Sequence, residues 1–199
     1  MSRIFISLLL ATAWIDGHAQ SSLPPCPDEP FDQWSNCSAT WTFPDDSKYS
    51  GGWKDDKQYG RGSLISPQGY TIVEGIWRDD RTVMTSGVRW YLAGYAAESR
   101  FFVSMESIRQ DGAFRRAWVM SAYYEPITEN RWLSARALHK FDCLDQRQLT
   151  MTITLFSGSF GSGESSGTVD NDQWKYVPPG TGFFDVMKYV CDYKLTPKK

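Results

Sequence analysis

Residues 31–81 contain a repeat of about 23 residues. The stretch TFPDD at 42–46 corresponds to ISPQG at 65–69, which lies 23 residues further on. Four residues recur 24 positions later in the same order, with Gly51, Trp53, Asp55 and Asp56 returning as Gly75, Trp77, Asp79 and Asp80. A period of this length indicates stacked supersecondary units rather than one globular core.

The best unit, YSGGWKDDKQYGRGSLISPQG, begins at Tyr49 and resembles the MORN repeat. The residues that fall on the family pattern are Tyr49, Gly51, Trp53, Gly60, Gly62 and Gly69. The resemblance implies β-hairpins with aromatic side chains stacked between units, and glycines where backbones come close or φ is positive. A degenerate unit precedes it at 34–48 and a truncated one follows at 73–81. Because such units need neighbours, we expect them to lean on the rest of the chain or on another chain.

The first 20 residues have the pattern of an export signal. Arg3 precedes an apolar run at 4–15, and Gly17 and Ala19 stand at the spacing that a signal peptidase reads. The run is shorter than the roughly 20 residues of a membrane-spanning helix. We therefore predict cleavage near Ala19 and a location in the periplasm or at the bacterial cell surface. A buried N-terminal helix is the weaker alternative, because no cap or amphipathic pattern accompanies the run.

Export would place the four cysteines in an oxidising compartment. Cys26, Cys37, Cys143 and Cys191 form an even set, so two disulfides are expected. Three pairings are possible. We favour Cys26 with Cys37 and Cys143 with Cys191, because each pair then stays inside one of two regions, 21–85 and 86–199.

Residues 88–192 alternate in the manner of antiparallel strands. Asp111-Gly112 lies between two β-rich runs and predicts a hairpin. Strands are expected next at 131–143 and 149–156, with one face of the latter formed by Leu149, Met151, Ile153 and Leu155.

The rest of this region is predicted to be a loop and a helix. The run at 157–172 has the composition of a flexible loop. Thr181 is expected to cap a helix whose buried residues are Phe183, Val186, Met187 and Val190. The predicted fold class is mainly β (α+β), with MORN-like β-hairpin repeats followed by an antiparallel β-sheet domain with a C-terminal helix.

The order of these signals resembles the surface-adhesin protein E family over about 88–192. The features that match are Trp90, Trp118, Asp142-Cys143, Trp174, Pro179-Gly180-Thr181 and Cys191. The resemblance implies a small antiparallel sheet with a helix, displayed at the bacterial envelope, that binds a protein such as a host matrix protein. No short ligand-binding motif of the family maps onto this sequence, so no binding residue is predicted.

The chain lacks the residues that common catalytic sites need. One histidine, His139, remains after removal of the signal, and no Gly-x-Ser-x-Gly elbow occurs. The glycine-rich run at 158–165 lacks the lysine of a phosphate loop, and the paired aspartates recur as repeat turns. We therefore predict no catalytic residue, cofactor or metal site.

The charge pattern limits the classes of binding partner that the sequence supports. Formal net charge is −2 with both signs interspersed, which favours neither a nucleic-acid partner nor a purely electrostatic membrane contact.

We expect an exported, non-catalytic, adhesin-like envelope protein that binds a macromolecule such as a host matrix or envelope protein. The alternative is a periplasmic inhibitor or immunity protein that neutralises an effector enzyme; an unfamiliar enzyme comes third. Any exposed cluster among six aromatic residues would mark the binding patch: Tyr91, Tyr95, Phe101, Phe102, Tyr123 and Tyr124.

Overall fold

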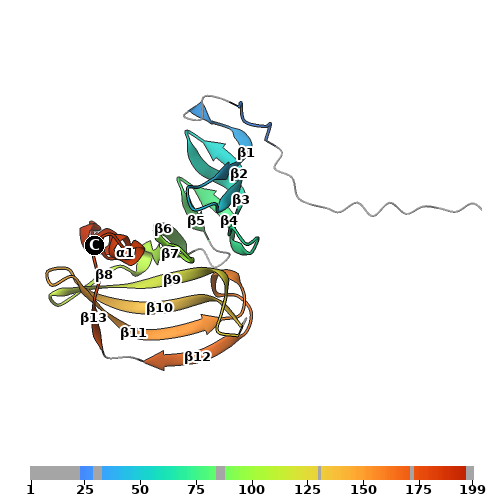
Figure 1. Ribbon diagram of the computed structural model, residues 1–199. Coiled ribbons are helices and arrows are strands. Elements are labelled where there is room, and N and C mark those ends of the chain that lie inside the picture. Colours follow the sequence, from blue (N-terminus) through green and yellow to red (C-terminus); the bar gives the residue numbers. More distant parts are fainter. Residues whose placement is uncertain (1–22, 29–32, 84–87, 130, 171–172, 196–199) are drawn as a thin grey trace, which may run out of the picture.

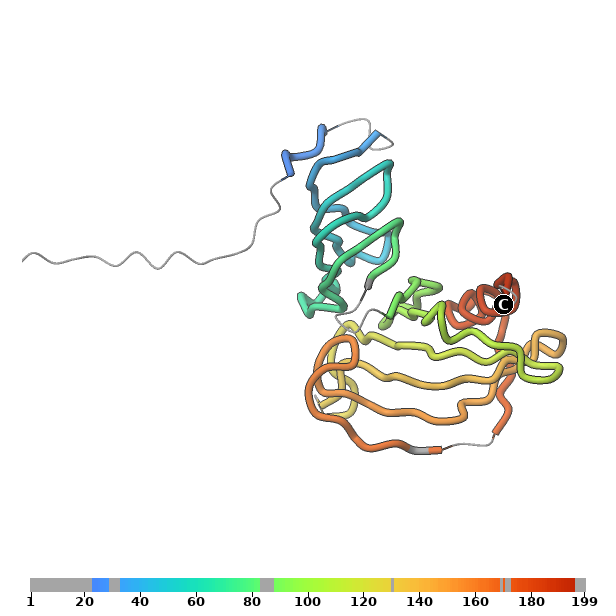
Figure 2. Tube along the Cα trace, turned by 180° about the vertical axis from the view of Figure 1, so that it is seen from behind, coloured from blue at the N-terminus to red at the C-terminus, as the bar shows by residue number. Residues whose placement is uncertain are grey.

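A computed structural model describes residues 23–28, 33–83, 88–129, 131–170 and 173–195. The predicted export signal lies outside these residues. The described chain forms a sheet of thirteen strands and one α-helix. Figure 1 shows strands β1 to β5, between Cys37 and Val83, stacked as a column that rises from the wider sheet of strands β9 to β12, between Phe114 and Asp170. Figure 2 gives the view from behind.

The three longest strands, of 14, 11 and 10 residues, lie in the second region. In chain order the elements are β1 (Cys37–Thr42), β2 (Lys48–Lys54), β3 (Lys57–Ile65), β4 (Thr71–Arg78), β5 (Arg81–Val83), β6 (Arg89–Ala96), β7 (Ser99–Ser104), η2 (Met105–Ser107), β8 (Arg109–Asp111), β9 (Phe114–Ile127), β10 (Trp132–Asp142), β11 (Arg147–Phe156), η3 (Ser159–Gly161), β12 (Ser165–Asp170), β13 (Trp174–Tyr176) and α1 (Gly182–Asp192). The path runs β1-β2-β3-β4-β5-β6-β7-β9-β10-β11-β12, with β8 paired to β9 and β13 to β11.

Paired aspartates make the turns of the first region. Asp55 and Asp56 join β2 to β3 with φ of 51° and 59°, and Asp79 and Asp80 join β4 to β5 with φ of 51° and 62°. Tight two-residue hairpins need positive φ at both central positions, where Asp is one of the few tolerated residues besides Gly and Asn. The recurring aspartates are therefore explained by backbone geometry.

A column of aromatic rings runs through these hairpins. The Tyr49 ring lies edge-on to Trp53 and to Trp77, with centroids 5.3 and 5.2 Å away, and Trp34 continues the column at 5.2 Å from Trp53. A Cβ at Gly62 would lie 2.6 Å from ring atoms of Tyr49, so only glycine lets the ring cross the strand there. The repeating aromatics and glycines thus fit one another across successive strands.

The second region carries α1 on one face of its sheet, called here the helix face. The helix packs on β6, β7 and β9. The buried residues of this core are Val103, Ile108, Ala117, Val119, Phe141, Val177, Val186, Met187 and Val190. The side chain of Thr181 accepts a hydrogen bond from the backbone N–H of Phe184, so the helix begins at the predicted cap.

The hairpins of the first region pack on the opposite face, at one end of the sheet. Trp77 and Ile72 share a core with Phe102 of β7, Met120 of β9 and Phe160 of η3. Strand β5 pairs with β6, so the sheet itself continues from one region into the other. The first region therefore leans on the second, as repeat units with few neighbours require.

Two details of the strand prediction were wrong. A bulge near Leu138 and His139 leaves Met151 without a partner in β10, so the alternation of β11 reverses there. Leu149 consequently shares a face with Lys140, whereas Ile153 and Leu155 lie on the other face. The run 157–172 is not simply a loop, because it contains η3 and β12.

The disulfide pairing is the predicted one, and the hairpin turn lies close to its predicted position. The structure has disulfides between Cys26 and Cys37 and between Cys143 and Cys191. The turn between β8 and β9 occupies Gly112 and the next residue, because Asp111 pairs with Phe114. It therefore lies one residue later than the Asp-Gly pair suggested.

Candidate binding surface

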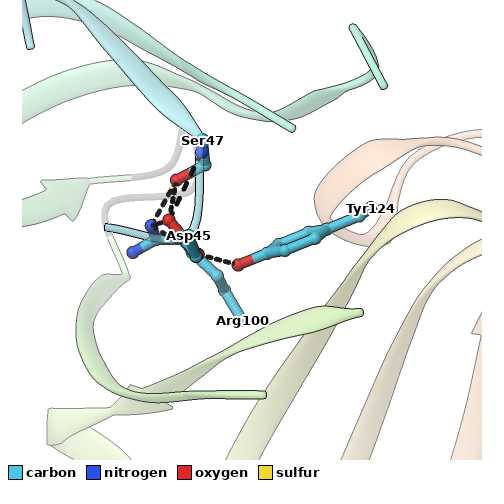
Figure 3. Close-up of polar contacts among 4 residues, drawn as sticks. All are labelled: Asp45, Ser47, Arg100 and Tyr124. Carbon is cyan, nitrogen blue, oxygen red and sulfur yellow. Dashed lines mark hydrogen bonds and ion pairs between the residues drawn. The ribbon is translucent and has the colours of Figure 1, made fainter. Parts of the chain in front are cut away.

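A buried polar cluster joins the two regions (Figure 3). Arg100 of β7 is 3% exposed at its side chain and donates from Nη2 to both carboxylate oxygens of Asp45, at 2.9 and 3.0 Å. Tyr124 of β9 donates to the same carboxylate, and Arg100 also donates to Ser47. The Arg100 guanidinium lies 4.6 Å from the centre of the Phe43 ring. Residues far apart in sequence thus form one ion pair, with a buried arginine and a half-buried aspartate.

The electrostatics of this cluster indicate a structural role. Burial raises the pKa of Asp45, but the hydrogen bonds from Tyr124 and Ser47 and the charge of Arg100 outweigh it and leave the pKa below the ordinary value. Burial and the neighbouring Asp45 raise the pKa of Tyr124. A stable carboxylate and a stable phenol offer no proton-transfer chemistry near neutral pH.

His139 is buried among structural residues. Its Nδ1 lies 2.8 Å from Oε1 of Gln148, and its ring packs edge-on to Phe183 of α1. Burial lowers the pKa of His139 to about 4, although the hydrogen bond with Gln148 opposes this shift. The imidazole is therefore neutral at pH 7. It lies beneath α1 rather than in a cleft.

A hollow of about 500 Å³ lies beside α1 on the helix face. It is lined by residues of both charges, and Lys188 and Asp192 at its rim pair with each other at 2.6 Å. The Tyr91 and Tyr189 rings stack at 4.3 Å along one wall. Within the described ranges, no group of three or more His, Cys, Asp or Glu side chains could hold a metal ion.

The uncovered part of the sheet opposite α1 carries a row of cations. Arg109 of β8 pairs with Arg116 of β9, and Arg116 pairs with Lys140 of β10. The row continues to Leu149 of β11 and Trp174 of β13. Residues directly opposite in antiparallel strands point to the same face. Three positive side chains therefore stand side by side on neighbouring strands, within about 10 Å of sheet.

Half-buried aromatic rings surround this row. Phe114 and Trp174 pack together with centroids 5.2 Å apart, with Lys140 Nζ 5.6 Å from the Phe114 ring and the Arg147 guanidinium 5.2 Å from the Trp174 ring. Further along, Arg136 lies 5.7 Å from the Trp118 ring. We call this surface the open face, defined by Arg109, Phe114, Arg116, Trp118, Arg136, Leu138, Lys140, Arg147, Leu149 and Trp174.

The carboxylates near the open face neutralise only some of its cations. Lys140 pairs with Asp111 at 2.9 Å, and Arg147 pairs with Asp142 and Asp145. Among the described residues, Arg109, Arg116 and Arg136 have no salt bridge. Arg116 and Arg136 are also exposed. The open face therefore has an excess of positive charge on a chain whose formal net charge is −2.

The six aromatic residues considered in the sequence form no exposed cluster that would mark a binding patch. Phe102 and Tyr124 are buried, Tyr91, Phe101 and Tyr123 are half-buried, and Tyr95 is exposed. The open face was not predicted from the sequence. The alternation of Phe114, Arg116 and Trp118 indicated a shared face, but the register that brings in Arg109, Lys140 and Trp174 has no local signal.

The repeat-motif residues are structural in this arrangement. Tyr49, Trp53 and Trp77 are buried in the aromatic column, and Gly51 and Gly62 lie against Tyr49. None of them belongs to the open face. Within the part of the chain that the structure describes, no helix is both long and apolar enough to cross a membrane.

The chain is similar to a known protein family and to one solved structure described below. The model of the family described as surface-adhesin protein E matches residues 90–192. Among solved structures, that of Haemophilus influenzae protein E matches with a TM-score of 0.38 and 12% identity, covering 58% of this chain and 86% of that chain. No match was found among curated proteins. Because the family model spans half of the chain, from β6 to the end of α1, the chain belongs to the surface-adhesin protein E family.

Proposed function

We propose that this chain is an exported protein of the bacterial envelope that binds a macromolecular partner, in the first instance a host matrix or envelope protein, and carries out no catalysis. The family match over residues 90–192 is the observation that carries the proposal. The buried state of His139, which is neutral at pH 7, agrees with a binding role rather than acid–base chemistry.

The open face is the proposed contact surface. It combines exposed arginines with half-buried aromatic rings, the residue types that are enriched where proteins bind one another. The helix face offers less, because α1 covers much of it and because Lys188 and Asp192 beside the hollow pair with each other.

The first region is proposed to be a short array of MORN-type hairpins that acts as a spacer or a secondary contact. Its positive-φ turn aspartates and its stacked aromatics support this assignment. The spacer would place the open face away from the N-terminal end of the mature chain.

Surface exposure and a matched pair of variants test the proposal. Protease added to intact cells is expected to degrade the protein, and full-length mature protein is expected to bind immobilised matrix or envelope proteins. Arg116→Ala on the open face should weaken that binding, whereas Arg61→Ala, at an exposed position of β3, should not. Resistance to protease in intact cells, together with binding of a periplasmic enzyme, would favour an inhibitor or immunity protein instead.

A further inference from the structure

The open face holds an arrangement that folding alone does not favour. Arg109, Arg116 and Lys140 lie directly opposite one another on three adjacent strands. Like charges in such cross-strand positions destabilise a sheet. Lys140 is offset by Asp111, but Arg116 sits between two cations without a carboxylate among the described residues. An anion bound across the row would relieve this repulsion.

The geometry of the row suits an extended polyanion. Neighbouring strands are about 4.8 Å apart, so the row presents positive groups at short, regular steps across the sheet. Arg136, which lies four residues before Lys140 on β10, extends the positive surface by about 13 Å along the strand. The arginine guanidinium can donate two parallel hydrogen bonds to two oxygens of a planar carboxylate or of a tetrahedral phosphate-like group such as sulfate.

The aromatic rings identify the class of polyanion. Phe114, Trp118 and Trp174 are half-buried beside the cations, so part of each apolar ring stays open to solvent. A sugar ring has an apolar C–H face that packs on such rings, while its carboxylates or sulfates project from the rim toward neighbouring cations. A purely acidic polypeptide such as polyglutamate would use the cations, but it has no apolar ring face to pack on the aromatic side chains.

We propose that the open face binds an acidic polysaccharide, with Arg109, Arg116 and Lys140 pairing with its anionic groups and Trp174 and Trp118 packing on its sugar rings. The inference rests on the proposed function, because it assigns the chemistry of the partner that the open face holds. The polysaccharide would be the part of a matrix or envelope component that contacts this sheet.

The test uses the full mature chain and heparin, a sulfated polysaccharide, as the probe in titration calorimetry. We expect binding that weakens as NaCl rises from 50 to 200 mM, since release of counterions drives such association. Arg116→Glu should weaken binding at least tenfold, and Arg61→Glu, the same charge change on β3, should alter it less than twofold. Uncharged dextran should not bind.

Two measurements separate a lost contact from a lost fold. Arg116→Glu places a carboxylate between Arg109 and Lys140, so its midpoint of thermal unfolding should equal or exceed that of the parent protein while its affinity falls. Trp174→Leu keeps an apolar side chain against Phe114 but removes the flat ring. This variant should weaken heparin binding several-fold with its salt dependence unchanged.

Several outcomes would overturn the inference. Equal binding of polyglutamate and heparin, with Trp174→Leu unaffected, would assign the open face to an acidic polypeptide. Binding to phosphatidylglycerol vesicles but not to heparin would assign it to a lipid surface. Absence of heparin binding in a protein that still binds matrix or envelope proteins would reject the polysaccharide and leave the proposed function standing. Absence of both, on a protein shown to be folded, would reject the proposed function itself.

Discussion

At the scale of single residues, Asp45 is the position at which a small change should cost most. Its carboxylate faces the buried Arg100 guanidinium and accepts a hydrogen bond from Tyr124. Asp45→Asn preserves size but leaves a buried positive charge without its partner, which typically costs about 3 kcal/mol or more of the free energy of unfolding. Urea denaturation at pH 7 measures the loss. Asp46→Asn, at an exposed neighbouring position, is the control and should cost well under 1 kcal/mol.

His139 should make stability depend on pH in a defined window. Its pKa is about 4 in the folded chain and about 6.5 when unfolded. The unfolded chain therefore binds the extra proton between these values, so the contribution is fully present above pH 6.5 and is lost as pH falls toward 4. The loss amounts to roughly 3 kcal/mol at most. Denaturation curves from pH 7 to 4.5 should show this decline, and His139→Gln should flatten it. An unchanged slope in that variant would assign the decline to carboxylates.

Residue roles that depend on local backbone geometry could be predicted from sequence, whereas contacts between distant residues could not. The aspartate pairs at 55–56 and 79–80 could be placed in turns from sequence, because backbone sterics at a two-residue hairpin act locally. The pairing of Asp45 with Arg100 could not, because its partners are 55 residues apart and nothing nearby records the contact. The same holds for the row through Arg116.

At the scale of elements, the disulfide between Cys143 and Cys191 should stabilise the protein more than the one between Cys26 and Cys37. The first joins the turn after β10 to the end of α1 with a sequence separation of 48, and the second spans 11. In the chain-entropy model these loops correspond to about 4 and about 3 kcal/mol. Replacing each pair by alanines and comparing urea midpoints tests the order. A larger loss from the Cys26 and Cys37 pair would show that native-state contacts, not loop length, set the ranking.

Strand faces could be predicted only while the alternation was unbroken. In β9 the alternation from Phe114 to Met120 holds, and the sequence identifies both faces. In β11 one extra residue, Met151, reverses the alternation, and a bulge of this kind depends on the partner strand rather than on local composition. The serine- and glycine-rich run 157–172 was predicted to be a flexible loop from its composition, which does not record long-range packing either. Phe160 within it is buried against Phe102 and Trp90, and this packing holds the segment in place.

At the scale of the whole molecule, the two regions that the sequence separates should unfold as one unit. They share a continuous sheet through β5 and β6, a core that includes Trp77 and Phe102, and the buried pair of Asp45 and Arg100. Opening either region alone would expose this core and leave a buried charge unpaired, so partial unfolding is expected to be costly.

Hydrogen exchange with mass spectrometry across a urea series tests this coupling. Amides of β2 and β3 should lose protection at the same urea concentration as those of β9 and β10. A fragment covering 88–199 should be much less stable than the full mature chain, because Arg100, Phe102 and Tyr124 would lose their partners from the first region. Adding Arg100→Met and Tyr124→Phe to that fragment removes the unpaired polar groups and should recover part of the loss. Two separate transitions in the full chain, with a fragment as stable as the parent, would show that the junction does not couple the regions.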